Sequence, residues 1–213
     1  MFKLYGFFRS GTSHRLRIAL NMKGVPFEHA SVNLSKNEHL GTEFGSINPQ
    51  RFVPVLEVDG RLMTQSPAII EWLEERYPDP PLLPADLNAR AHVRALAAIV
   101  GCDIHPLNNK RVLDMLRQRL SSDEAGVKAW CTAWISAGFG AYEALLSAKV
   151  PRGRFSYGTS PTLADVYLVP QIESARRFGI DMNQWPLLQS INVACLELEP
   201  FASAAPAAQP DAF

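Results

Sequence analysis

Hydrophobic and polar positions divide the chain into a mixed first part and a helical second part. Short apolar runs alternate with amphipathic segments up to about residue 77, a pattern typical of strands alternating with helices. The pattern predicts strands at 3–7, 27–32, 53–58 and 61–64, and helices at 12–23, 37–44 and 66–77. Later apolar residues recur at helical spacing and predict helices at 88–119, 123–148, 162–178 and 185–199.

Local signals support several of these elements. Asp59-Gly60 is a strong hairpin signal between the last two strands. Ser66-Pro67 predicts a helix start, with serine as the N-cap and proline at the first helical position. Thr162 and Asp165 resemble a capping box, with Asp in place of the usual Glu.

A proline-rich stretch separates the two parts. It contains four prolines between residues 78 and 84 and predicts a stiff linker. We therefore expect an α/β domain at 1–79, a linker at 80–87 and an all-α domain at 88–213. The Ala/Pro-rich segment from Ala202 onward is expected to be frayed.

Composition excludes several classes of function. The 213 residues include 21 basic and 21 acidic side chains, and this balance argues against a nucleic-acid or polybasic membrane partner. No apolar run reaches the roughly 18 residues that span a membrane, and no signal-peptide pattern opens the chain. The three cysteines, Cys102, Cys131 and Cys195, form no CxxC pair and are interpreted as reduced packing residues, while the histidines show no metal-ligand spacing. A soluble cytoplasmic protein without a metal is the expectation.

The turn after the first strand carries the most specific chemistry. Ser10 and Thr12 place two hydroxyls at the start of a helix, where free backbone N–H groups attract anions. A thiolate is one such anion. Because the turn contains no cysteine, a thiolate would have to come from a ligand.

Val53-Pro54 stands at the start of a predicted strand. Proline there removes a ladder donor and suits an edge or a strand start. With a cis bond, the N–H and C=O of Val53 could pair with an extended ligand as an added strand, and with a trans bond the proline is an ordinary edge residue. The sequence leaves both open.

These residues together resemble a known family. The matching segments are 10–20, 48–50, 53–56, 65–73 and 162–165. They resemble the zeta class of glutathione S-transferases, which includes maleylacetoacetate isomerase, in the expected order over almost the whole chain. The usual Ser-Ser-Cys of that class reads Ser10-Gly11-Thr12 here, a variant that looks more like the bacterial maleylpyruvate isomerases. Any activity that depends on the missing cysteine is put in doubt.

The resemblance implies a glutathione transferase fold, a thioredoxin-like N-terminal domain plus an all-α C-terminal domain, with glutathione as cofactor. Glutathione would be held at its γ-glutamyl end by Gln65 and Ser66, and at its cysteinyl part by Val53. The remaining implied contacts, for the glycyl carboxylate, are His39, Gln50, His105 and Asn109. Its thiol would lie at Ser10 or Thr12, whose hydroxyls either face the thiolate or only cap the helix.

Arginines are the expected ligands of a dianionic substrate, because they bind carboxylates through paired donors. Arg9 lies on the turn, and the resemblance places Arg177 over the thiol, with Arg111 as a third candidate. Arg15 and Arg17 are interpreted as structural charges of the first helix.

The implied reaction is a glutathione-dependent cis–trans isomerisation of maleylpyruvate to fumarylpyruvate. The thiolate adds to the double bond, the bond rotates, and the thiolate leaves, while arginines stabilise the developing charge. Alternatives are isomerisation of maleylacetoacetate, a conjugating or dehalogenating transferase, and a non-enzymatic binding protein. A homodimer is implied by the resemblance alone.

Overall fold

The structure of the chain, a computed structural model, describes residues 1–148 and 153–213. It divides into two compact units. The first comprises Met1–Pro81 together with Leu196–Phe213, and the second comprises Leu82–Cys195. The first boundary lies close to the expected 1–79, but the last 18 residues belong to the first unit and not, as expected, to the helical one.

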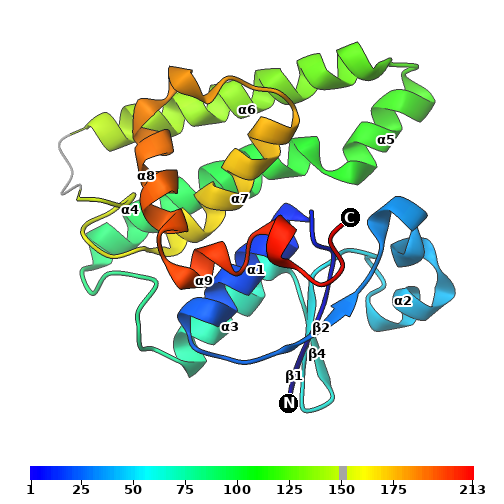
Figure 1. Ribbon diagram of the computed structural model, residues 1–213, viewed down its shortest axis with the longest axis horizontal. Coiled ribbons are helices and arrows are strands. Elements are labelled where there is room, and N and C mark those ends of the chain that lie inside the picture. The colour runs from blue at the N-terminus through cyan, green and yellow to red at the C-terminus, as the bar shows by residue number, and fades with distance from the viewer. Residues whose placement is uncertain (149–152) are drawn as a thin grey trace. The chain divides into compact units, whose positions relative to one another are not determined.

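A four-stranded mixed sheet forms the centre of the first unit (Figure 1). Its strands are β1 (Phe2–Gly6), β2 (Glu28–Ser31), β3 (Val55–Val58) and β4 (Arg61–Thr64), in the order β2-β1-β3-β4. β1 is parallel to β2 and antiparallel to β3, and Leu4 is paired with His29 on one side and Leu56 on the other. The predicted strands and the Asp59-Gly60 hairpin are confirmed. Asp59 and Gly60 both have positive φ, 51° and 82°, as the two central residues of a type I′ hairpin turn require.

Helices cover both faces of this sheet. α1 (Gly11–Met22) packs against α3 (Ser66–Arg76) on one face, and α2 (Thr42–Ile47) lies on the other (Figure 1). A buried cluster unites the face next to α2 with the turn after β1, and it consists of Phe7, Phe8, Val32, Phe44, Val53 and Val55. The turn that carries the candidate chemistry is therefore built on the hydrophobic core of the unit.

Two local predictions in this unit were wrong. The expected helix at 37–44 is replaced by two 3-10 turns, Leu34–Lys36 and Glu38–Leu40, followed by α2. Asn37 adopts a left-handed conformation and Gly41 an extended one, and both interrupt a continuous helix. Ser66 is not the N-cap of α3 but its first residue, because the capping position is taken by Gln65.

The segment from Ala202 is ordered, so the expectation of a frayed tail was also wrong. It follows α9 (Glu199–Ala202), which packs against α1, and it contains a 3-10 turn at Pro206–Ala208. Phe201 and Ala204 are fully buried. The Arg17 guanidinium donates from Nε to the Ala204 carbonyl at 3.0 Å. Buried apolar side chains and a hydrogen bond from a buried cation hold the segment, although its composition is typical of a disordered one.

The second unit is helical. It contains α4 (Leu87–Ala98), α5 (Lys110–Arg119), α6 (Glu124–Ser147), α7 (Leu163–Arg177) and α8 (Pro186–Leu196). The single helix expected at 88–119 was wrong. A π-helical segment, Ile99–Ile104, and a 3-10 turn, His105–Asn108, interrupt it where Pro106 lacks a backbone N–H.

The capping box of α7 is confirmed. The Asp165 carboxylate accepts from the Thr162 N–H at 2.7 Å, and it also accepts from the Ser156 N–H at 2.8 Å. The carboxylate is completely buried, and this burial raises the pKa of Asp165.

The proline-rich stretch is not an exposed linker throughout. Leu82 and Leu83 within it are buried. The Leu82 carbonyl accepts from the Leu163 N–H at 2.8 Å within the second unit. The peptide bonds before Pro54 and Pro80 are both cis. For Pro54, this resolves the alternative that the sequence left open.

The cysteines differ in their surroundings. Cys131 and Cys195 are buried, as expected of packing residues, and burial raises the pKa of the Cys131 thiol to about 11. Cys102 is exposed, so its interpretation as a packing residue was wrong.

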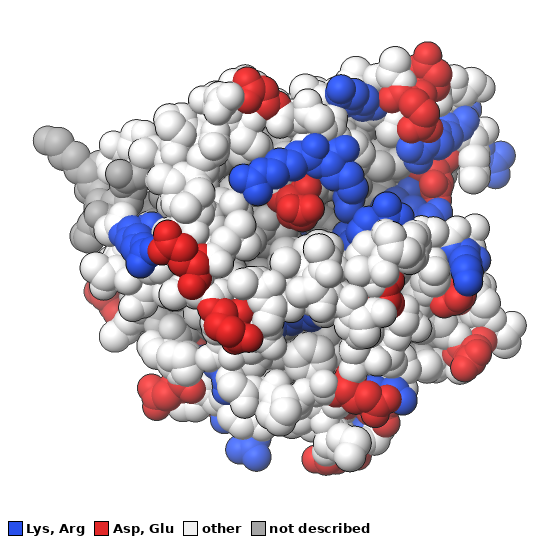
Figure 2. Space-filling view, in the orientation of Figure 1, with Lys and Arg blue, Asp and Glu red and all other residues white. Residues whose placement is uncertain are grey.

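Charged side chains are distributed in small groups of both signs over the face seen in Figure 2, with uncharged areas between them. Within the described residues, none of the helices combines the length and apolarity needed to cross a membrane.

Candidate functional site

The two hydroxyls of the turn are joined to each other and to Val53. Ser10 is the N-cap of α1, and its Oγ accepts from the Ser13 N–H at 3.2 Å. Ser10 Oγ lies 2.9 Å from Thr12 Oγ1, and Thr12 Oγ1 donates to the Val53 carbonyl at 2.9 Å. The structure therefore brings three of the predicted site residues into one hydrogen-bonded chain.

This series of hydrogen bonds determines which hydroxyl is the donor in each contact. A hydroxyl has one proton to donate. Because Thr12 gives its proton to Val53, Ser10 must be the donor in the contact between the two hydroxyls. The Ser10 proton can rotate from the Thr12 oxygen to an incoming anion without breaking the contact between Thr12 and Val53.

Two helix N-termini in the first unit are suited to bind anions. Neither α1 nor α3 has an acidic residue in its first turn. Ser66 opens α3 and is buried, and Gln65 before it has a φ of 68°, which directs the chain into the helix from a left-handed position. Free N–H groups at such a terminus carry partial positive charge.

The predicted glutamines lie together beside α3. Gln65 Nε2 donates to Gln50 Oε1 at 2.6 Å, and Asn48 Oδ1 accepts from the Gln50 N–H at 3.1 Å. Val53 follows a few residues later and lies just before the paired residues of β3, which begin at Val55. Its backbone is therefore outside the sheet ladder. His39 is in the 3-10 turn Glu38–Leu40 and is half-buried.

Arg9 extends from the turn and is exposed. Its guanidinium carbon lies 5.8 Å from the centre of the Phe7 ring, 5.2 Å from that of Phe8 and 5.5 Å from that of Phe213. Its Nη2 is 3.3 Å from Ser35 Oγ. Arginine side chains both pack against aromatic rings and bind carboxylates through their N–H groups.

The other predicted residues belong to the helical unit. Asn109 is the N-cap of α5, and its side-chain oxygen accepts from the Arg111 N–H at 3.2 Å, so at least part of its role is structural. His105 opens the preceding 3-10 turn, and Arg111 is exposed in the first turn of α5. Arg177 lies in the last turn of α7, where the helix dipole favours a cation, and donates to Ser174 Oγ at 3.3 Å.

Buried polar residues behind the turn are structural. Arg17 is fully buried and donates from Nη2 to the Phe8 carbonyl at 3.0 Å, and burial lowers its pKa to about 10. Burial, assisted by the charges of Arg17 and Arg15, lowers the pKa of His14 to about 3. His14 is therefore neutral at physiological pH. The interpretation of Arg17 as a structural charge is confirmed.

The sequence reasoning missed two residues of this region, Asp211 and Phe213. The Asp211 carboxylate accepts from the Phe8 N–H at 3.2 Å, and the Phe213 ring is one of the three around Arg9. No sequence signal could have found them, since they lie about 200 residues from the turn in a segment without periodicity.

Known proteins share this fold and much of this sequence. Residues 4–81 match the family described as glutathione S-transferase, N-terminal domain. The maleylpyruvate isomerase of Ralstonia sp is 62% identical over 209 residues, 98% of this chain and 99% of that protein.

Two solved structures match almost the whole chain. A holo structure of maleylpyruvate isomerase, described as a bacterial zeta-class glutathione S-transferase, matches with a TM-score of 0.98 and 62% identity over 99% of this chain and 100% of its own. A maleylacetoacetate isomerase from Anaeromyxobacter dehalogenans, with GSH bound in its active site, has a TM-score of 0.89 and 44% identity over 100% of this chain and 98% of its own.

The chain belongs to the glutathione S-transferase family. Within that family it belongs to the zeta class, and the expected glutathione transferase fold is confirmed.

Proposed function

We propose that this protein is a glutathione-dependent cis–trans isomerase that converts maleylpyruvate to fumarylpyruvate. The observation that carries the proposal is the 62% identity, over nearly all of both chains, with a relative of that name. A second observation supports it: the turn at Ser10 and Thr12 has hydroxyls that could donate to a thiolate but contains no cysteine of its own. Maleylacetoacetate is the second candidate substrate, because a structural relative of that name is 44% identical.

The residues of the first unit fit glutathione as a ligand. The N-terminus of α3 at Ser66, without acidic neighbours in its first turn, suits the γ-glutamyl carboxylate, with Gln65 beside it. The backbone of Val53, outside the sheet ladder, suits the cysteinyl part as an added strand. Gln50 is within reach of the same region through its contact with Gln65. For the glycyl carboxylate, the proposed partners are His39 and Gln50 of this unit and His105 and Asn109 of the helical unit.

Ser10 is the proposed partner of the thiolate. Bound glutathione supplies a thiolate that adds reversibly to the substrate double bond and so permits rotation. The Ser10 hydroxyl donates to that sulfur and stabilises its charged form. Thr12 acts differently, because its proton is committed to the Val53 carbonyl, and it positions the backbone on which the cysteinyl part would pair.

Arginines are the proposed partners of the substrate. Arg9 from the turn, with Arg177 and Arg111 from the helical unit, bind its carboxylates and stabilise negative charge that develops on its carbonyl oxygen. We further propose that the protein acts in the cytoplasm as a homodimer.

Activity is tested by following maleylpyruvate and maleylacetoacetate with and without glutathione. The proposal requires turnover of maleylpyruvate that depends on glutathione and does not consume it. Equal rates without glutathione would overturn the proposed mechanism. Net consumption of glutathione with a halogenated acid, and no isomerisation, would indicate a conjugating transferase.

Two hydroxyl variants separate the proposed roles of Ser10 and Thr12. Ser10→Ala is expected to raise the pKa of the glutathione thiol in the complex by about one to two units, the value of one hydrogen bond to a charged group. Thr12→Val is expected to weaken glutathione binding and to leave that thiol pKa unchanged. The thiolate absorbance of the complex, titrated with pH, measures the first effect, and calorimetry measures the second. An unchanged thiol pKa in Ser10→Ala would refute the assignment.

A matched pair on α7 tests the substrate ligands. Arg177→Ala is expected to raise KM for maleylpyruvate about ten- to hundredfold, the value of one charge-assisted hydrogen bond. Its neighbour in the same last turn provides the control, since Arg176→Ala removes an exposed charge from the same helix end. Equal KM values for the two variants would remove Arg177 from the substrate site.

A further inference from the structure

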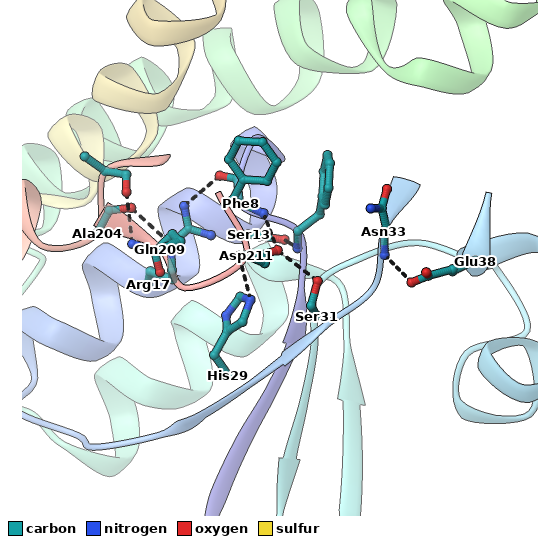
Figure 3. A network of polar contacts seen from close by, with 12 residues as sticks. Phe8, Ser13, Arg17, His29, Ser31, Asn33, Glu38, Ala204, Gln209 and Asp211 are labelled. Carbon is teal, nitrogen blue, oxygen red and sulfur yellow. Dashed lines mark hydrogen bonds and ion pairs between the residues drawn. The ribbon is translucent and has the colours of Figure 1, made fainter. Parts of the chain in front are cut away.

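The segment 199–213 is held against the turn that carries Arg9 and Ser10. Figure 3 shows Ala204, Gln209 and Asp211 of this segment facing residues of α1, β2 and the turn. Within the segment, Gln209 Nε2 donates to the carbonyls of Ser203 and Ala205, at 2.8 and 2.9 Å. These bonds give the segment a defined conformation, so its last residues reach the turn in a fixed orientation.

The Asp211 carboxylate connects the turn to β2. Its Oδ2 accepts from the Phe8 N–H at 3.2 Å and from Ser31 Oγ at 2.9 Å, and its Oδ1 lies 3.1 Å from His29 Nε2 (Figure 3). Both ionisable side chains are largely buried, Asp211 with 12% and His29 with 10% of the side chain exposed. On the other side of the Phe8 residue, its carbonyl accepts from Arg17. The backbone immediately before Arg9 is thus held by hydrogen bonds at both its N–H and its C=O.

Phe213 reaches the Arg9 side chain itself. Its ring packs edge-on against Phe8, with centroids 5.0 Å apart, and lies 6.4 Å from the Phe7 ring. Together the three rings surround the Arg9 guanidinium at 5.2 to 5.8 Å. Two rings come from the turn, and the third comes only from the distant segment.

We propose that Asp211 and Phe213 are positioning residues for substrate binding: Asp211 fixes the backbone of the turn, and Phe213 completes the aromatic surround that orients Arg9 toward a dicarboxylate. This inference rests on the proposed function in one respect, the role of Arg9 in binding a substrate carboxylate. An arginine has many rotamers, and fixing it before the substrate arrives reduces the entropy lost on binding. Cation–π contacts with the rings restrain the guanidinium, and its N–H groups are the donors that a carboxylate binds.

Phe213→Leu tests the proposal most directly, because leucine keeps an apolar side chain and removes the ring face. We expect KM for maleylpyruvate to rise about two- to fivefold, the value of one exposed cation–π contact, with kcat nearly unchanged. Phe213→Tyr, which retains the ring, should restore the wild-type KM. Calorimetric binding of malonate, an unreactive dicarboxylate, to the glutathione-loaded protein should weaken by the same factor in Phe213→Leu. Binding of glutathione alone should not change.

Asp211→Ala is a second, independent test of the proposal. It leaves the Phe8 N–H without its acceptor, and we expect KM to rise about tenfold or more, since a hydrogen bond to a charged group is lost. If this variant folds poorly, Phe213→Leu still decides the question. A matched control is Tyr77→Leu, which removes the ring beneath Arg76, 5.6 Å away, in the same unit. It should leave KM unchanged.

A double-mutant cycle separates failure of this inference from failure of the proposed function. Phe213→Leu should have no further effect on KM in an Arg9→Ala background. If Arg9→Ala itself leaves KM unchanged, the assignment of Arg9 is wrong and the inference fails with it. If Arg9→Ala raises KM but Phe213→Leu does not, or does so equally in both backgrounds, the positioning role is refuted and the proposed function stands.

Discussion

Replacement of His14 is expected to remove a specific acid sensitivity of the protein. His14 lies in α1 just after the candidate turn and is 3% exposed. Its buried Nε2 has no hydrogen-bond partner among the described residues. Burial first, and then the neighbouring charges of Arg17 and Arg15, lower its pKa from 6.5 to about 3. Folding therefore requires this imidazole to be neutral.

The sign and the magnitude follow from proton binding in the two states. Between a pH of 6.5 and about 3 the unfolded chain binds a proton at His14 and the folded chain does not. Stability therefore rises with pH through this window and is lost as the pH falls below 6.5, by about 1.4 kcal/mol for each full unit. Integrated from about pH 7 to about pH 5, the loss is about 2 kcal/mol, which corresponds to a fall in Tm of about 4–8 °C for a chain of this size.

Thermal denaturation of the wild type and of His14→Leu over this pH range measures the effect. The difference in Tm between the two proteins should change with pH by the amount above, whatever the other carboxyl and imidazole groups contribute, because their contributions are common to both. His92→Leu, a histidine substitution in the helical unit, controls for removal of an imidazole. If the wild type and His14→Leu show parallel pH profiles, His14 is not held neutral by burial and the reasoning fails.

Four further substitutions test the packing within each of the two units. Asp165→Ala removes a completely buried carboxylate that accepts hydrogen bonds from two backbone N–H groups, and the free energy of unfolding in urea should fall by about 3 kcal/mol or more. An unchanged midpoint would contradict its capping role. On α6, a Cβ at Gly138 would lie 2.3 Å from the Ile104 side chain and one at Gly140 would meet nothing, so Gly138→Ala should lose about 1–3 kcal/mol and Gly140→Ala should gain about 0.5–1 kcal/mol; equal midpoints would refute the close packing. Lys23→Met breaks an ion pair of 2.6 Å at a fully buried ammonium and should cost about 3–5 kcal/mol in the same assay, and a cost below about 1 kcal/mol would indicate that the pair is not closed in solution.

Local signals predicted the fold where a short stretch of chain determines its own conformation. The hairpin at Asp59-Gly60 and the capping box at Asp165 need only neighbouring residues, and both are confirmed. The strands around them were also found to within two residues. The prediction of a helix at 37–44 was wrong because Asn37 is left-handed and Gly41 is extended, and both conformations interrupt a helix. The spacing of apolar residues does not reveal such single-residue conformations.

The candidate site was predicted only in part. The residues on the turn and before α3 could be named because their types and order match a family. That Thr12 donates to Val53, and so leaves Ser10 as the available donor, could not be inferred, because it depends on two residues 41 positions apart.

The sequence by itself determined the alternation of elements, the division into a mixed and a helical part, and the family with its glutathione chemistry, because these are recorded in local periodicity and in motifs. The tertiary structure alone decided that residues 196–213 belong to the first unit and that Asp211 and Phe213 contact the turn. Such contacts join positions about 200 residues apart, through one carboxylate and one ring. Neither leaves a pattern in the sequence, since their geometry exists only after the core around Phe8 has formed.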